Sequence, residues 1–295
     1  MSDELTLDSS NEGFDKEQQR QAASKISDEQ LKKLALQHSK KEGTFKRPSE
    51  TIDLPSKGML YDLTNPLSSG QIELYHPTAR DEDILMTSSK IKKGTVIDDF
   101  ISALIASPIN YDDLLVGDRD KLVIVARILA YGAKYKATVN DPDIPSESQD
   151  VEFNLQDVEE IGINESETTP NTNLFSFKLP TSELTVSFKL PTVGMNKKID
   201  EEIKRTKQLS TKVDRSLSVR LKHLIVDIEG ESSRSVINDF VDNQLLTMDS
   251  KALRTYIKSV SPGIDLSYNF ISDLTDKQRR LEIPIGNPNF FWPNS

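Results

Sequence analysis

The chain has 295 residues, 36% hydrophobic and 28% charged, and it contains no cysteine, which excludes disulfides, thiolate zinc sites, iron–sulfur clusters and cysteine nucleophiles. Its formal net charge of −10 argues against a general nucleic-acid binder, because phosphate contacts need clustered Lys and Arg. It has no apolar run near the ~20 residues that span a bilayer, and its acidic start is unlike a signal peptide, so we expect a soluble cytoplasmic protein.

The first 47 residues are expected to form a flexible N-terminal arm. This segment is charged and rich in Gln and Ser, with brief helical periodicity only around Leu31, Leu34 and Leu36. So few apolar residues cannot offset the entropy lost when a backbone is ordered. Residues 1–47 therefore need another surface in order to fold.

Residues 48–137 are predicted to form a mainly helical domain with short strands. Gln71–Tyr75 alternates polar and apolar residues, which is typical of a half-buried strand. Thr78 is a candidate cap for a helix, a second helix follows Thr95 and ends by Pro108, and a third runs from Gly117 to Gly132.

Residues 138–195 are predicted to be an acidic linker followed by a β-hairpin or small meander. Between Ala137 and Phe177 there are ten acidic residues and no Lys or Arg, so the chain's negative charge is concentrated here. Next, Ser176–Thr181 recurs as Ser187–Thr192, and both copies read Ser-Phe-Lys-Leu-Pro-Thr. The proline in each copy should lie at a strand end, since proline cannot donate to a ladder.

Residues 196–295 are predicted to form a helical C-terminal domain with a β extension and an aromatic tail. An apolar stripe runs from Ile199 through Ile225 and Ile228 to Gly230. A second helix covers 235–246, and Asp249 is a candidate N-cap for a third that ends near Val260. Residues 265–271 and 281–285 could pair as strands. The expected fold class is α+β: two mainly helical domains, small antiparallel β elements and the flexible arm.

The C-terminal aromatic residues need a surface on which to dock. Phe290, Phe291 and Trp292 precede Pro293, at an end where most chains fray. Burying three such rings is worth on the order of 10 kcal/mol before ordering costs. Two alternatives remain open: the tail packs on its own core, or Phe290, Phe291, Trp292 and Pro293 bind a partner.

No combination of residues predicts catalysis, a metal site or a cofactor. His76 lies five residues before Asp81-Glu82-Asp83, which leaves a metal-dependent hydrolase as an alternative. Carboxylates at a helix start need no metal, however, and Pro77 separates His76 from that helix. The sequence contains neither of the glycine-rich phosphate-binding motifs, G-x-x-x-x-G-K-[ST] and G-x-G-x-x-G. Asp118-Arg119-Asp120 with Arg127 is interpreted as a structural ion-pair network.

Three sets of segments, taken in order, resemble the baseplate hub assembly proteins of T4-like contractile-tailed bacteriophages. The resemblance covers roughly Pro48 to the C-terminus, without much of the acidic and repeat region. The first set is 54–58, 73–75, 79–85 and 92–95; the second is 113–119, 126–127 and 131–132; the third is 228–230, 253–257, Pro262, Pro284 and 290–293. The motif residues assigned a structural role are Arg80, Asp81, Glu82, Asp83, Gly117, Asp118, Arg119, Arg127, Tyr131 and Gly132.

The chain departs from this family in one respect. Relatives often carry Cys-x-x-Cys pairs that suggest zinc ribbons. The corresponding stretches here, 139–151 and 266–281, have no cysteine. Ribbons at these places would have to be held by hairpin pairing and packing alone.

The resemblance implies a non-enzymatic protein of phage tail morphogenesis. It would bind hub or tape-measure subunits, either as an assembly chaperone or as a structural part of the baseplate. Its partners would be other phage tail proteins rather than nucleic acid or membrane. It would be found in the host cytoplasm during virion assembly, and in the tail baseplate if it stays there. A generic cytoplasmic adaptor, whose arm folds on binding, is the remaining alternative.

Overall fold

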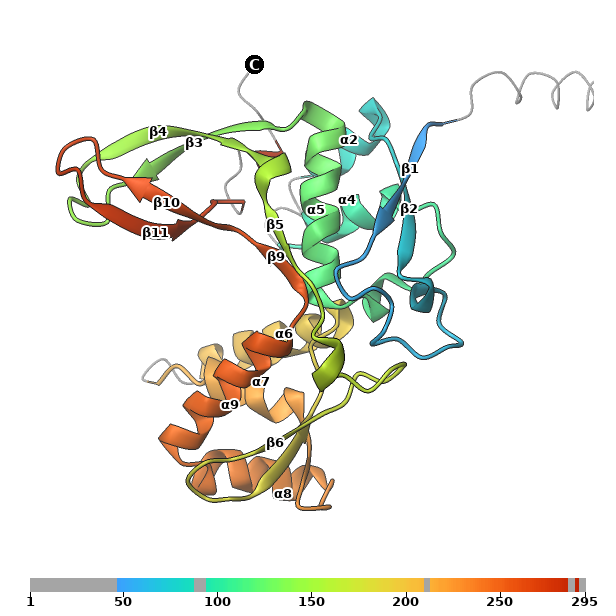
Figure 1. Cartoon of the computed structure of the whole chain (residues 1–295), viewed down its shortest axis with the longest axis vertical. Coiled ribbons are helices and arrows are strands. Elements are labelled where there is room, and N and C mark those ends of the chain that lie inside the picture. Colours follow the sequence, from blue (N-terminus) through green and yellow to red (C-terminus); the bar gives the residue numbers. More distant parts are fainter. Residues whose placement is uncertain (1–46, 88–93, 210–212, 286–289, 292–295) are drawn as a thin grey trace, which may run out of the picture. The chain divides into compact units, whose positions relative to one another are not determined.

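The computed structural model describes residues 47–87, 94–209, 213–285 and 290–291. Its contacts divide the chain into Met1–Pro48 and Ser49–Ser295. Apart from Arg47, the predicted arm lies outside the described residues. The second unit combines helices with small antiparallel sheets, which confirms the α+β class (Figure 1).

The first part of this unit follows the sequence prediction closely. Strand β1 (Ser49–Asp53) pairs antiparallel with β2 (Gln71–Tyr75), and the helices α2 (Ala79–Leu85), α4 (Val96–Leu104) and α5 (Val116–Tyr131) follow (Figure 1). Helix α4 ends at Leu104, four residues before Pro108, and Gly132 ends α5 at φ +83°. The buried residues of α4 include Phe100, Ile101 and Leu104, which form one face of that helix.

The acidic stretch contains strands that the linker prediction missed. Strand β3 (Lys134–Asn140) pairs with β4 (Ser148–Asn154), so the expected boundary between residues 137 and 138 falls inside β3. A second hairpin, outside this stretch, joins β10 (Ser267–Ile271) to β11 (Gln278–Glu282), where residues 265–271 and 281–285 were predicted to pair. Strand pairing is possible because acidic residues such as Asp150 and Glu152 stay on the exposed or partly exposed surface while Phe153 is buried.

The two hairpins lack cysteine and are joined by hydrogen bonds at their turns. Asp141 Oδ1 accepts from the backbone N–H of Asp143 (2.8 Å) and of Ile144 (3.2 Å). Ser272 Oγ accepts in the same way from two backbone N–H groups of its own turn and donates to Asp141 Oδ2. Gln149 Nε2 also donates to the Ile271 carbonyl at 2.9 Å. Polar side chains thus hold together the two stretches in which cysteine pairs were considered.

The repeat region forms a three-stranded sheet of β6 (Phe175–Lys178), β7 (Thr185–Phe188) and β8 (Ile225–Ile228). Strand β8 corrects the prediction that Ile225 and Ile228 continue a helical stripe. The β-branched run Ile225-Val226 favours a strand, and β7 offers an edge on which it pairs. Strand β5 (Glu159–Ile161) pairs with β9 (Gly263–Asp265), which lies far from it in the sequence.

The C-terminal helices are α6 (Val193–Leu209), α7 (Ser216–Leu224), α8 (Arg234–Asp239) and α9 (Thr247–Val260). Helix α8 passes directly into a π-helical turn, η5 (Phe240–Gln244). The prediction of Asp249 as N-cap was wrong, because α9 begins at Thr247 with Leu246 as its N-cap. Buried Asp249 instead accepts hydrogen bonds from the backbone N–H of Thr181 (2.7 Å) and of Ser182 (3.0 Å).

One hydrophobic core extends through all three predicted segments of residues 48–295. It includes Phe100 and Leu122 from the first, Phe153 and Phe188 from the second, and Leu253 from the third. The division into separate domains within this range stays a prediction.

Gly117 allows α5 to approach β9 at van der Waals distance. A Cβ at this position would lie 1.9 Å from the carbonyl oxygen of Pro262 and 2.9 Å from Cα of Gly263. Both are backbone atoms, so neither can move aside as a flexible side chain would. The absence of a side chain at Gly117 therefore sets the distance between the α5 start and the β5–β9 pair.

We expect Gly117→Ala to lower the free energy of unfolding by about 2 kcal/mol, since overpacking against backbone exceeds the gain of about 1 kcal/mol in helix propensity. Gly162→Ala is the matched control, because no atom lies within 4 Å of its added Cβ. Urea unfolding of both variants checks this. Equal stabilities would show that the α5–β9 approach is not tight.

Candidate protein-binding surfaces

The start of α5 carries a buried carboxylate that holds the loop between β1 and β2. Asp118 is fully buried and accepts from the backbone N–H of Ser56 (2.9 Å), from Ser56 Oγ (2.7 Å) and from the Tyr61 hydroxyl (2.5 Å). Tyr61 in turn accepts from the Leu115 backbone N–H at 2.9 Å. Burial raises the pKa of Asp118, although these hydrogen bonds oppose the shift. The motif carboxylate is thus used entirely in joining the loop to the helix.

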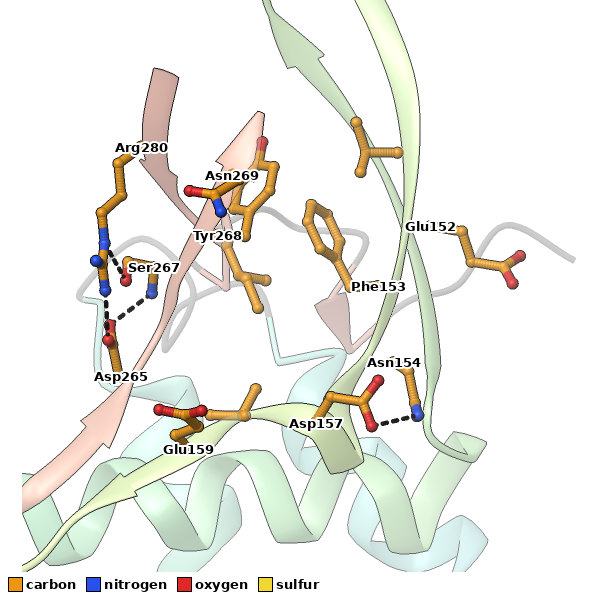
Figure 2. A pocket seen from close by; sticks show the side chains of 13 residues that line it. Glu152, Phe153, Asn154, Asp157, Glu159, Asp265, Ser267, Tyr268, Asn269 and Arg280 are labelled. Carbon is orange, nitrogen blue, oxygen red and sulfur yellow. Dashed lines mark hydrogen bonds and ion pairs between the residues drawn. The ribbon is translucent and has the colours of Figure 1, made fainter. Parts of the chain in front are cut away.

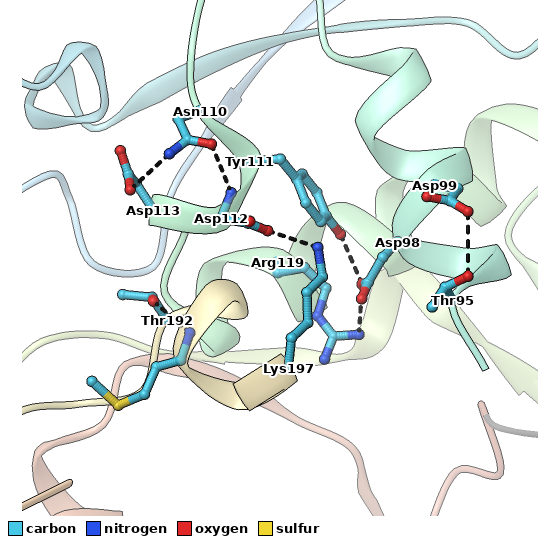
Figure 3. A network of polar contacts seen from close by, with 11 residues as sticks. Thr95, Asp98, Asp99, Asn110, Tyr111, Asp112, Asp113, Arg119, Thr192 and Lys197 are labelled. Carbon is cyan, nitrogen blue, oxygen red and sulfur yellow. Dashed lines mark hydrogen bonds and ion pairs between the residues drawn. The ribbon is translucent and has the colours of Figure 1, made fainter. Parts of the chain in front are cut away.

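Arg119 belongs to a second polar network that joins α4, α5 and α6 (Figure 3). Its guanidinium lies 3.1 Å from Asp120 and 3.8 Å from Asp98, which also accepts from the Tyr111 hydroxyl at 2.9 Å. Beside it, Lys197 of α6 donates to Asp112 at 2.7 Å. Burial raises the pKa of the Tyr111 hydroxyl, with the Asp98 charge adding to the effect. These contacts are structural ties between helices.

Arg127 lies in the core and fastens the aromatic C-terminal residues. Its side chain is 2% exposed, and it donates to the carbonyl oxygens of Phe290, Gly132 (2.9 Å) and Lys134 (3.3 Å). Its guanidinium carbon also lies 5.1 Å from the centroid of the Tyr131 ring and 5.9 Å from that of Phe290. Burial lowers the pKa of this guanidinium.

Phe290 and Phe291 pack on the chain's own core. Phe290 meets Tyr135 edge to face at 5.0 Å between centroids, and Phe291 meets Phe100 at 5.3 Å. Both phenylalanines are almost completely buried. This is the self-docked alternative, and a partner could contact these two rings only if they left the core. Trp292 and Pro293 lie outside the described residues, so their predicted contact with a partner stays a prediction.

The acidic start of α2 is also occupied by local contacts. Asp81 is buried and accepts from the backbone N–H of Thr78 (2.8 Å) and from its hydroxyl (2.7 Å). Glu82 accepts from the Tyr131 hydroxyl at 2.8 Å, while Arg80 and Asp83 are exposed. His76 Nε2 lies 3.0 Å from Glu50.

The described residues contain no group of three His, Cys, Asp or Glu side chains that could hold a metal ion. The alternative of a metal-dependent hydrolase at His76 and Asp81–Asp83 therefore has no ligand set in this part of the chain.

A cavity of about 480 Å³ lies between β4, β5 and β10 (Figure 2). Phe153 and Tyr268 meet there edge to face at 4.7 Å, and the Tyr268 hydroxyl is buried without a hydrogen-bond partner among the described residues. Asp157 accepts from Asn154 at 3.0 Å, and Asp265 pairs with Arg280 at 2.7 Å. These carboxylates are each held by a neighbour and do not converge as an acid–base pair.

A second hollow, of about 650 Å³, lies between α7, η5 and the start of α9. We call it the α7–α9 groove. Its apolar lining is Val213, Leu217, Leu221, Val241 and Leu245. Val213 is 60% exposed and Leu217 is 45% exposed. Thr247 also lines the groove, and both of its neighbours in the chain are exposed: Leu246 by 48% and Met248 by 66%.

Sequence reasoning did not single out this groove. A signal was present, because Val213, Leu217 and Leu221 recur at intervals of four along the predicted stripe. The pattern indicates an apolar helix face, but it does not show that part of this face is left uncovered.

Residues 51–277, more than half of the chain, match the model of the family described as T4 bacteriophage base plate protein. The chain belongs to this family. No curated protein and no solved structure matches it. The match confirms the resemblance to T4-like baseplate proteins and includes both α5 and the α7–α9 groove. No described helix of this baseplate protein is both long and apolar enough to cross a membrane.

We expect Phe290→Ala to lower the free energy of unfolding by about 3–5 kcal/mol, because it removes a fully buried ring beside a buried guanidinium. Leu274→Ala is the control, since Leu274 is 63% exposed and its loss should change stability by less than about 0.5 kcal/mol. Urea denaturation measures both. If Phe290→Ala were as stable as the control, the aromatic end would not belong to the core.

Proposed function

We propose that this baseplate protein is not an enzyme and acts by binding other tail proteins, namely hub or tape-measure subunits, during baseplate assembly. The observation that carries the proposal is the α7–α9 groove, where apolar side chains remain exposed beside a hollow of about 650 Å³. Apolar side chains left exposed beside polar ones in a hollow are a feature of protein-interaction sites.

The apolar residues at the groove differ from isolated exposed residues elsewhere. Leu63, for example, is 74% exposed but lines none of the cavities described above. At the groove, Val213 and Leu217 line the same hollow as Leu221, Val241 and Leu245. A partner side chain placed between them would lose contact with water on several sides at once.

The use of the ionisable motif residues supports a binding role over catalysis. Asp118 holds a loop, Asp81 bonds to Thr78, the N-cap of α2, and Arg127 fastens the C-terminal aromatic residues. Each is engaged by its neighbours in contacts that stabilise the fold. A general acid or base must instead be within hydrogen-bond reach of a substrate.

Two versions of the proposal remain. As an assembly chaperone, the protein would cover apolar surface on unassembled subunits and then leave. As a structural component, it would keep the same contacts in the finished baseplate. The two versions differ in whether the protein is found in purified virions.

We expect the double variant Val213→Asp, Leu217→Asp to reduce co-purification with hub and tape-measure subunits from infected cells by about tenfold or more, because buried carboxylates at an apolar contact would be strongly unfavourable. Both side chains are exposed in the chain alone, so circular dichroism should show no loss of helix.

Leu63→Asp with Leu274→Asp is the matched control, since it adds the same two charges at exposed leucines that do not line the groove. Undiminished co-purification of the double variant, or an equal loss in the control, would contradict a binding role for the groove.

A further inference from the structure

We infer that the α7–α9 groove takes an amphipathic helix with carboxylates beside its apolar face, supplied by another tail protein. The inference rests on the proposed function and specifies the chemistry of the partner. It follows from the secondary structure of the groove walls and from an imbalance between their charges.

The walls favour a helix over an extended segment. Leu217 and Leu221 belong to α7, Val241 to η5, and Arg254 to α9. In helices the backbone donors and acceptors bond within the element, as Leu245 N–H does to the Phe240 carbonyl at 2.8 Å. An added strand would find no ladder here, whereas a helix satisfies its own backbone and offers side chains alone.

The carboxylates of the groove are already paired. Asp242 accepts from Lys222 at 2.7 Å. Asp214 accepts from the Ser216 backbone N–H at 2.9 Å and lies 3.5 Å from Lys207. The hydrogen bonds of Ser216 are the largest cause of the lowered pKa of Asp214. The negative charges of the groove are thus engaged within the chain.

The two arginines that line the groove differ from its carboxylates in their ion pairing. Arg215 and Arg254 are exposed and line the groove, and neither forms an ion pair within the described ranges 47–87, 94–209, 213–285 and 290–291. Arg254 uses Nε for the Ser250 carbonyl at 3.2 Å, which leaves its two terminal nitrogens for a ligand. A guanidinium presents donors in a planar fork that suits a carboxylate.

These features together favour an acidic helix over nucleic acid. Phosphates would leave the leucines and valines of the groove uncovered, whereas a helix can cover them with apolar side chains of its own. A helix with apolar residues at i, i+3, i+4 and i+7 would place its apolar stripe against the leucines and valines, and carboxylates flanking that stripe would reach Arg215 and Arg254.

The test uses the purified full chain and two fluorescein-labelled helical peptides of about 18 residues with the same leucine stripe. One peptide carries Glu on both flanks of the stripe, and the other carries Lys at the same positions. We expect the Glu peptide to bind about tenfold more tightly than the Lys peptide, measured by fluorescence anisotropy. Added salt should reduce this difference.

Arg215→Glu with Arg254→Glu should reverse the preference between the peptides. The control is Arg205→Glu on α6, whose guanidinium lies 3.6 Å from Glu201 and which does not line the groove; it should leave the preference unchanged. The Leu217→Asp variant should weaken both peptides. Circular dichroism establishes that each variant is folded.

Equal binding of the two peptides, or no binding of either, would overturn the inference. So would a concentration-dependent dimer in sedimentation that the groove variants abolish, because a second copy would then be the occupant. A loss of co-purification in infected cells combined with equal peptide binding would leave the proposed function standing while rejecting the acidic helix.

Discussion

The buried guanidinium of Arg127 is the contact on which the arrangement of the C-terminal end depends. A charge in the core is costly unless its hydrogen bonds are satisfied. Arg127 meets this requirement with the carbonyls of Gly132, Lys134 and Phe290, the first two near the end of α5 and the third from the far end of the chain. Removing the C-terminal residues would take away the Phe290 carbonyl to which Arg127 Nε donates. The same contact therefore explains why Phe290 and Phe291 are core residues.

This arrangement separates stability from recognition. The aromatic residues that looked most suited to a partner, Phe290 and Phe291, stabilise the chain itself. At the α7–α9 groove, by contrast, Val213 and Leu217 are exposed, and Arg215 has no ion-pair partner among the described residues. Membership of the baseplate family and this groove together support the proposal that the protein works through contacts with other tail proteins.

Local sequence patterns predicted much of the fold, and contacts between distant segments account for most of what they missed. Thr78, Thr95 and Gly132 marked helix ends correctly because capping is a local property. Ile225 was placed in a helix, since its spacing continues the apolar stripe, but its pairing with Phe188 of β7 depends on a partner strand far away in the sequence. The pairing of β5 with β9 could not be predicted for the same reason. At the candidate site, the sequence indicated the apolar helix face but not its exposure.

Hydrogen–deuterium exchange of the full chain, alone and in complex with a co-purified hub or tape-measure subunit, tests the central claim most directly. The account predicts that partner binding slows exchange in residues 213–254, while Phe290 and Phe291 exchange slowly in both states. Slowed exchange confined to the C-terminal aromatic residues, with residues 213–254 unchanged, would contradict it.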